Sequence, residues 1–260
     1  MDNFTLINNT IDSFIKNKVK EGNVGGVIFG LSGGIDSTLV AFLATKALGN
    51  KNVLGLLLPD KEITPQQDID DAMKICSILK IPYKIIYVNK IKNEFLNTLG
   101  KTDDRLVEGN LVSRIRMNIL YYYANFLNKM VLGTTNKTEI TTGYFTKYGD
   151  GASDLSPIGC LYKTQVREFA KFLNIPNQII YKKSSARLWA NQQTEDDIGL
   201  LFDELDKILI FINKQKKDNI DLSLLEENFP SIPKEKINHI LYLIKKNKHK
   251  YSSSTVCALS

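Results

Sequence analysis

The stretch GLSGGIDST, residues 30–38, contains the side chains of this sequence that are best suited to chemistry. It places three glycines and three hydroxyl residues around one carboxylate, Asp36, directly after the apolar run VIF. A glycine-rich turn that leads from a strand into a helix exposes backbone N–H groups, and the start of the helix adds a partial positive charge. The stretch therefore predicts a phosphate-binding loop.

Two common phosphate-binding patterns are absent from this loop. A Walker loop ends in GK[ST] and a dinucleotide fingerprint reads GxGxxG, and residues 30–38 match neither. Asp36 cannot neutralise phosphate by itself, but a carboxylate can hold Mg²⁺ against phosphate oxygens. A simpler interpretation stays open at this point: the SGG segment is a tight turn, and Asp36 is a first-turn residue that the helix dipole stabilises by about 0.3–1 kcal/mol.

The elements that must position this loop follow an alternating pattern. Short runs rich in Val, Ile and Leu alternate with longer amphipathic segments over residues 25–135. The predicted strands are GGVIFGL, NVLGLLLP, YKIIYVN and KMVLGTT. Continuous apolar strands separated by helical segments are typical of parallel strands covered on both faces. The predicted fold class is α/β, with an open, mostly parallel, Rossmann-like sheet and helices on both faces.

Helical periodicity continues in the second half of the chain. Apolar residues recur at helical spacing over residues 166–173, 198–209 and 237–244. These segments predict helices with one buried face, the last two forming a C-terminal helical extension. Residues 252–260, SSSTVCALS, are predicted to be a poorly ordered tail.

Two connections are too long for simple turns. Residues 134–159 are rich in Gly, Thr and Asp between a predicted strand and a helix, and residues 181–197 contain the only tryptophan. Long loops in compact domains are usually lids or binding segments. In an open α/β sheet such loops gather at the carboxyl ends of the strands, where ligands bind. We therefore expect both to lie beside residues 30–38.

Composition limits the classes of function. The 260 residues include 43% hydrophobic residues, which suits a buried core, and no stretch approaches the roughly 18 apolar residues of a membrane span. We expect a cytoplasmic protein without a membrane partner. Cys76, Cys160 and Cys257 form no CxxC pair, so reduced and mostly buried thiols are predicted. The net charge of +6 comes from lysines spread along the chain, so small phosphate-rich molecules are preferred over nucleic acid as partners.

The loop resembles the SGGxDS pyrophosphate loop of the N-type ATP pyrophosphatases, whose fold is that of the adenine nucleotide alpha hydrolases. Further motifs are similar to those of ammonia-dependent NAD synthetases, in the same order and spacing. They are GNLVSRIRMNILYYYAN, GTTNKTEITTGYFTKYGDGASDLSPIG, LYKTQVREFAKFLNIP and SSARLW. The likeness covers nearly the whole chain, and GYFTKYGDGASD, residues 143–154, is its most specific part.

The resemblance implies an enzyme that amidates deamido-NAD with ammonia, the last step of NAD biosynthesis. ATP would be the co-substrate and Mg²⁺ the cofactor, with AMP, pyrophosphate and NAD⁺ as products of a deamido-NAD adenylate intermediate. It also implies a homodimer and one domain over residues 1–260, with a core at about 20–180, lid and C-terminal helices at about 181–250, and no glutaminase domain. Another N-type ATP pyrophosphatase and a nucleotide-binding relative without turnover are the alternatives.

The resemblance also assigns site residues. The implied ATP ligands are Gly30, Leu31, Ser32, Gly33, Gly34, Ile35, Asp36, Ser37, Thr134, Lys163 and Ser185. The implied deamido-NAD ligands are Arg114, Lys147, Asp154, His249 and Lys250. Mg²⁺ is assigned to Asp36 and Glu139, and the catalytic roles to Asp36, Lys163 and Asp154.

Several of these residues also have a purely structural interpretation. Arg114 could be a solvated helix charge, and His249 could belong to a solvated helix end. The segment 181–197 departs from the family pattern, with Ser184 at a common proline position, Arg187 at a small or acidic position and Thr194 at an aspartate position. Because proline pre-sets backbone shape, the serine predicts a lid that is more mobile before ATP binds.

Overall fold

The computed structural model describes residues 3–215, 222–251 and 257. Its centre is a four-stranded parallel sheet in the order β3-β2-β1-β4. The strands are β1 (Val27–Gly30), β2 (Val53–Leu57), β3 (Tyr83–Ile85) and β4 (Met130–Val131). All four lie within the predicted runs, and the predicted open parallel α/β sheet is confirmed.

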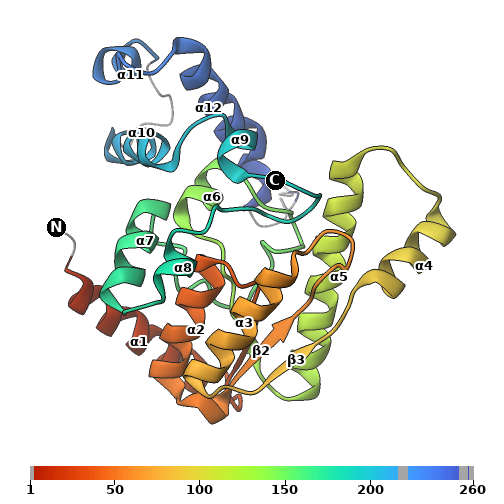
Figure 1. Ribbon diagram of the computed structural model, residues 1–260. Coiled ribbons are helices and arrows are strands. Elements are labelled where there is room, and N and C mark those ends of the chain that lie inside the picture. The colour runs from red at the N-terminus through yellow and green to blue at the C-terminus, as the bar shows by residue number, and fades with distance from the viewer. Residues whose placement is uncertain (1–2, 216–221, 252–256, 258–260) are drawn as a thin grey trace.

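Helices cover both faces of this sheet (Figure 1). Alternate side chains of a strand point to opposite faces. Val27 and Phe29 of β1 pack into a core with the helices of one face, and Ile28 packs against α5 on the other face. Both faces are therefore dry, which explains why the strands are apolar without alternation. The covering helices are α1 (Phe4–Glu21), α2 (Ile35–Leu48), α3 (Gln66–Leu79), α7 (Lys163–Phe172) and α8 (Asn177–Ile180) on the first face, with α5 (Arg105–Phe126) on the second and α4 (Asn89–Leu99) packed beside α5.

A second apolar cluster lies beyond the sheet. Phe202 and Leu205 of one helix meet Ile237 and Ile240 of another, and all four are buried. The C-terminal helices that build or flank this cluster are α9 (Thr194–Ile198), α10 (Phe202–Gln215), α11 (Leu222–Asn228) and α12 (Lys234–Asn247). The shorter elements are α6 (Lys137–Thr142), η1 (Asn50–Asn52) and η2 (Lys248–Lys250). The predicted helical extension is present, and the single-domain division with a boundary near residue 180 stays a prediction.

Three further expectations have mixed outcomes. Cys76 is buried, but Cys160 and Cys257 are exposed, so the prediction of mostly buried thiols is wrong for two of the three cysteines. Cys160 lies in a surface turn after the long loop. The predicted disorder of the tail falls, apart from Cys257, on residues outside those described. Among the described helices, none has the length and apolar character needed to cross a membrane.

A buried ion pair fastens α4 to the loop after β2. Lys92 Nζ lies 2.9 Å from Asp60 Oδ2 and 3.0 Å from Glu62 Oε2, and the side chains of Lys92 and Asp60 are almost completely buried. Burial by itself raises the pKa of Asp60, but Lys92, the Glu62 amide and Asn89 outweigh burial and hold that pKa below its ordinary value. The pair therefore stabilises the folded state while both groups are charged.

We expect Lys92→Met to lower the free energy of unfolding by about 3–5 kcal/mol, because Asp60 then stays buried without its cation. Since the folded pKa of Asp60 is lowered, the stabilisation is present above about pH 4 and is lost as the pH falls through the folded value. Urea denaturation at pH 7 measures the change. Lys90→Met on the exposed side of the same helix is the control, and equal midpoints for the two variants would contradict the expectation.

Candidate active site

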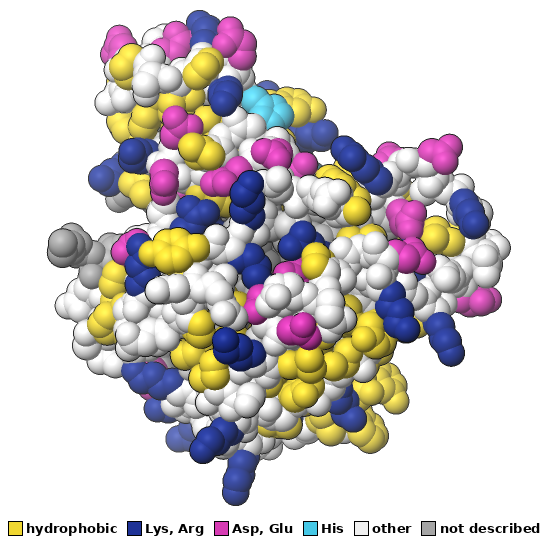
Figure 2. Space-filling model, in the orientation of Figure 1, with side chains coloured by type: hydrophobic (Ala, Val, Ile, Leu, Met, Phe, Trp, Pro, Cys, Tyr) yellow, Lys and Arg dark blue, Asp and Glu magenta, His cyan; other side chains and the backbone are white. Residues whose placement is uncertain are grey.

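The carboxyl ends of the strands open into one cavity of about 570 Å³. Its walls come from the loop after β1, the ends of β2 and β4, α5, residues 142–152, residues 182–197 and the end of α12. Lys and Arg side chains gather around the central hollow in Figure 2. The cations that line it are Lys163, Lys182, Lys183, Lys246, Lys250, Arg116 and Arg187. Among the described residues, the same cavity is lined by five carboxylates, those of Asp36, Asp68, Glu139, Asp150 and Asp197. The excess of seven cations over five carboxylates favours an anionic ligand.

The predicted phosphate loop forms one edge of the cavity. Gly33 has φ +74°, and a Cβ atom there would lie 2.2 Å from the carbonyl oxygen of Asp68, so only glycine fits. The Ser32 amide donates to Ser37 Oγ at 3.2 Å, which folds the loop over the start of α2. The first N–H groups of a helix have no intrahelical partner. The loop and the start of α2 therefore have the strand–turn–helix geometry that residues 30–38 predict, and phosphate binding there stays a prediction.

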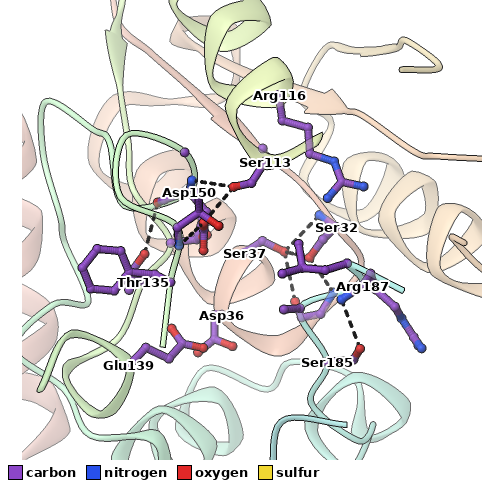
Figure 3. A pocket seen from close by; sticks show the side chains of 18 of the residues that line it. Ser32, Asp36, Ser37, Ser113, Arg116, Thr135, Glu139, Asp150, Ser185 and Arg187 are labelled. Carbon is purple, nitrogen blue, oxygen red and sulfur yellow. Dashed lines mark hydrogen bonds between the residues drawn. The ribbon is translucent and has the colours of Figure 1, made fainter. Parts of the chain in front are cut away.

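Asp36 is the centre of a charged cluster in the first turn of α2. Lys163 Nζ pairs with Asp36 Oδ2, and Asn136 Nδ2 donates to Asp36 Oδ1 at 3.0 Å. The Lys163 side chain is 1% exposed, so its ammonium has little water around it. Figure 3 shows the carboxylates of Asp36 and Glu139 side by side in the cavity. The structure thus brings together three residues that are far apart in sequence and that the resemblance assigned.

The pair Asp36 and Glu139 fits a divalent cation. A capping box at the start of α6 holds Glu139: its Oε2 accepts from the Asn136 amide at 3.0 Å, and its own amide donates to Asn136 Oδ1. Burial, reinforced by the charge of Asp36, raises the pKa of Glu139 to about 8, against the opposing effect of Lys163. A cation between the two carboxylates would favour both in their ionised form. Among the described residues no third carboxylate, His or Cys joins them, so phosphate oxygens and water would complete the coordination.

The C-terminal helices hold Lys163 in place. Asp206 on α10 accepts from Thr138 Oγ1 at 2.5 Å and from the Thr164 amide at 2.7 Å. The Lys163 amide donates to the same Thr138 hydroxyl at 2.9 Å. The beginning of α7 is therefore fixed through side chains of α6 and α10. Sequence reasoning missed Asp206, because nothing local distinguishes it from a surface acid of an amphipathic helix.

The predicted ATP ligands lie together. Ten of the eleven line the cavity, and Gly33 is the exception because it faces Asp68 instead. Thr134 follows β4 and Ser185 lies in the segment 182–197, and both line the cavity. The phosphate loop, Lys163 and this segment thus enclose a common space.

The predicted deamido-NAD ligands are placed differently. Lys250 lines the cavity, and its Nζ donates to the carbonyls of Gly143 and Phe145 at 2.7 and 2.9 Å. Lys147 Nζ donates to the His249 carbonyl at 2.7 Å, and Arg114 Nε donates to the Lys147 carbonyl at 3.3 Å. Arg114, Lys147 and His249 therefore form one cluster, but this cluster does not line the cavity of the single chain.

Asp154 lies apart from all of these residues. Its Oδ2 accepts from the Val131 amide at 2.7 Å, and its Oδ1 accepts from the Tyr121 hydroxyl at 3.2 Å. The carboxylate thus bonds to the backbone of β4 on the side that faces away from β1. Burial, together with the charge of Asp154, raises the pKa of Tyr121 to about 12. Asp154 is not among the residues that line the cavity, and its catalytic assignment stays a prediction.

Arg116 is a cavity residue that sequence reasoning missed. Its Nε donates to the Leu58 carbonyl at 3.0 Å and its guanidinium enters the cavity, whereas Arg114 is exposed on another side of α5 (Figure 3). Two residues that are two positions apart on a helix cannot share a face. The sequence therefore contained the signal that only one of these arginines faces the site, but not which one.

The segment 182–197 is closed over the cavity by polar contacts. The Thr194 amide donates to the Ser184 carbonyl at 3.0 Å, and Gln192 Nε2 donates to Asp197 Oδ2 at 2.8 Å. Asp197 also accepts from the Tyr144 hydroxyl at 2.6 Å. The segment, hereafter the lid, is therefore joined to the loop that follows α6.

Known proteins of similar sequence show the family to which the chain belongs. The family model described as NAD synthase matches residues 7–254. An NH3-dependent NAD⁺ synthetase of Thermococcus sibiricus is 46% identical over 92% of this chain and 91% of its own, and one of Methanocaldococcus jannaschii is 44% identical over 93% and 92%.

Two solved structures extend the comparison. The NMN synthetase of Francisella tularensis superposes with a TM-score of 0.87 at 30% identity and full coverage of both chains. The NH3-dependent NAD synthetase of Campylobacter jejuni superposes with a TM-score of 0.81 at 32% identity over 99% of this chain and 100% of its own. The chain therefore belongs to the NAD synthase family, as an enzyme of ammonia-dependent NAD⁺ synthesis.

Proposed function

We propose that the cavity converts the nicotinate carboxylate of deamido-NAD to an amide in two steps. A carboxylate is a poor acyl donor because its negative charge shields the carbon and it lacks a leaving group. The carboxylate oxygen first attacks the α-phosphorus of ATP, and pyrophosphate leaves. Ammonia then attacks the acyl carbon of the adenylate, and AMP leaves with the C–O bond electrons. The observation that carries this proposal is the Lys163, Asp36 and Glu139 cluster at the edge of the phosphate loop.

The residues of the chain have distinct parts in the first step. The backbone amides between Ser32 and Ser37 bind the departing pyrophosphate, because they lie at the start of α2, where N–H groups have no intrahelical partner. Lys163 donates to a phosphate oxygen as negative charge builds up, and its burial strengthens that interaction. Mg²⁺, held by Asp36 and Glu139, would neutralise phosphate charge when bound. Thr134 and Ser185 orient ATP from the cavity wall.

The acceptor is proposed to bind beside this centre. Lys250 and Arg116 present cations to the cavity, and Arg116 can hold a phosphate or carboxylate through two N–H groups. The cluster of Arg114, Lys147 and His249 lies next to these groups and is proposed to bind the far half of deamido-NAD. Asp154 is proposed to help form or orient the neutral ammonia nucleophile, either directly or through the Tyr121 hydroxyl.

A second acceptor is favoured by one observation. Four of the five residues assigned to the dinucleotide do not line the cavity of the single chain, and the Francisella tularensis relative is named for a mononucleotide product. Nicotinic acid mononucleotide carries the same carboxylate on a shorter molecule. It is the second candidate substrate.

One assay tests both acceptors. Purified protein is mixed with ATP, Mg²⁺, ammonium and either deamido-NAD or nicotinic acid mononucleotide, and AMP and the amide product are measured. We expect NAD⁺ and AMP in equal amounts, with a higher kcat/KM for the dinucleotide. A higher kcat/KM for the mononucleotide would favour the second candidate. AMP without either amide would indicate another acceptor, and no AMP would contradict the proposal.

A second copy of the chain is proposed to cover an apolar groove between α4 and α5. Tyr122 is 65% exposed and stacks on Phe126, which is 73% exposed. Hydrophobic side chains gather at the lower right of Figure 2, where α5 and β3 lie in Figure 1. The groove is lined by Ile86, Ile91, Phe95, Ile115, Asn118, Ile119, Tyr122 and Tyr123. A two-fold dimer is the commonest assembly of soluble proteins, and light scattering during chromatography tests whether this chain forms one.

We also propose a cytoplasmic location, where ATP and ammonia are available.

A further inference from the structure

The lid is tied to the start of α3 through one carboxylate. Arg187 Nε donates to Asp68 Oδ2 at 2.8 Å, and Lys182 Nζ donates to Asp68 Oδ1 at 3.1 Å. Asp68 therefore receives one lid cation on each oxygen, and its side chain is only 7% exposed. Lys182 also pairs with Asp71 and donates to the Gly33 carbonyl at 2.9 Å.

The start of α3 is a fixed support for this contact. The Asp68 backbone packs so closely against Gly33 that no side chain fits between them. The phosphate loop and the first turn of α3 are thus one rigid surface, on which Arg187 rests. A lid that is bonded to this surface has its position defined relative to the phosphate loop.

Arg187 occupies an unusual backbone conformation to make the contact. Its φ is +51°, in the left-handed region that residues with a side chain adopt at a cost. This conformation lets the Arg187 amide donate to Ser185 Oγ at 3.1 Å (Figure 3). The side chain of Arg187 at the same time reaches Asp68. One residue thereby orients a proposed ATP ligand and anchors the lid. A glycine would adopt this backbone without strain but could not form the ion pair.

Two other residues of the lid, Leu188 and Trp189, contact α5. Leu188 packs against Gly109 of α5, where an added Cβ would lie 2.7 Å from Leu188 Cβ, and the Arg105 guanidinium lies 4.7 Å from the centre of the Trp189 ring. These contacts place the middle of the lid on α5. Arg187 is the residue between Ser185 and Leu188 that connects the lid to the nucleotide side of the cavity.

We propose that Arg187 is a positioning residue that holds the lid closed over the phosphate loop before ATP binds, through its ion pair with Asp68. Because the lid is already closed, ATP does not have to order it, and the fraction of molecules competent to bind ATP is raised. Arg187 does not touch the reacting atoms. It therefore acts on the KM for ATP and not on kcat.

The variant Arg187→Asn tests this role, because asparagine tolerates left-handed backbone and removes the guanidinium with its ion pair; hydrogen exchange without nucleotide separates the loss of the ion pair from the loss of a cavity cation. We expect the KM for ATP to rise about fivefold, with kcat at saturating ATP within twofold of the wild-type value. Without nucleotide, amide hydrogen exchange of residues 183–193 is expected to accelerate by a similar factor, and saturating ATP should slow it again. Arg187→Lys, which keeps the charge, is expected to recover part of the protection.

Asn191→Gly is the matched control. Asn191 has φ +59°, lies in the same lid, is exposed and does not line the cavity, so this variant changes backbone freedom without removing an ion pair. In an Asp68→Asn background, Arg187→Asn should have no further effect on exchange. Wild-type exchange and KM in Arg187→Asn, or a fall in kcat with both unchanged, would overturn the proposal.

The expected change in the KM for ATP rests on the proposed function, whereas the expected change in amide hydrogen exchange does not. If the wild-type protein forms no AMP, the proposed function fails while the exchange of the lid still decides the role of Arg187. If wild-type turnover is normal and Arg187→Asn matches it in both readouts, only the positioning role fails.

Discussion

Asp36→Asn is expected to lower the turnover of deamido-NAD by about a thousandfold at saturating Mg²⁺. Asparagine has almost the same shape, but its neutral amide neither holds a cation against phosphate nor pairs with the Lys163 ammonium. Asn136 Nδ2 donates to Asp36 Oδ1 at 3.0 Å, so an amide nitrogen on that side would also leave two donors facing each other. AMP release under steady-state conditions measures the loss.

The control for this variant is Asp203→Asn. Asp203 is also an aspartate in the first turn of a helix, α10, but it is exposed and lies outside the cavity. Its substitution should leave turnover unchanged. Thermal unfolding of both variants separates loss of chemistry from loss of fold. Rates close to wild type for Asp36→Asn at saturating Mg²⁺ would contradict the proposed metal role.

Local sequence was sufficient to predict the phosphate loop and most of the sheet. The glycine at position 33 permits the turn, and the apolar runs predict strands that are covered on both faces. The run at residues 129–135 forms a strand only over Met130–Val131, because the chain then turns to meet the segment around Leu155. The Asp154 carboxylate accepts from the Val131 amide on the outer edge of this strand, a contact between residues 23 positions apart that local sequence does not predict.

The partners of the charged cluster could not be predicted from local sequence. Lys163 and Asp36 are 127 residues apart, and Arg187 and Asp68 are 119 apart. Only the family resemblance indicated the first pair, and nothing in the sequence indicated the second. Asp68 has the pattern of an ordinary first-turn acid of α3. Its role becomes visible only when the fold brings the lid to it.

The sequence has the pattern of a capping box where α6 begins. Asn136 and Glu139 have the N-x-x-E spacing of a capping box, which fixes the orientation of both side chains at the start of α6. Applied to residues 136–139, this rule predicts that the Glu139 carboxylate turns back toward the Asn136 amide. It would not have placed the Asn136 side-chain amide beside Asp36, because that contact joins residues 100 positions apart in the sequence.

Lys163→Met is expected to reduce kcat by about a hundred- to a thousandfold. Methionine fills a similar volume in the buried site and packs on Phe202, whose ring centre lies 5.5 Å from Lys163 Nζ, but it removes the cation. The phosphate charge that develops during adenylation then loses a preorganised donor. The expected loss is in kcat more than in the KM for ATP, because the lid and the loop amides still bind the nucleotide. Lys171→Met, on the exposed side of the same helix, is the control.

Combining Lys163→Met with Asp36→Asn tests whether the two residues act as a unit. Residues that form one catalytic unit have strongly non-additive effects, because removal of either one already disables the unit. The ion pair between them and their common contact with α6 predict a double variant only slightly slower than the slower single variant. A double variant whose loss equals the product of the two single losses would show that Lys163 and Asp36 act independently. The ion pair would then be a resting arrangement without a part in turnover.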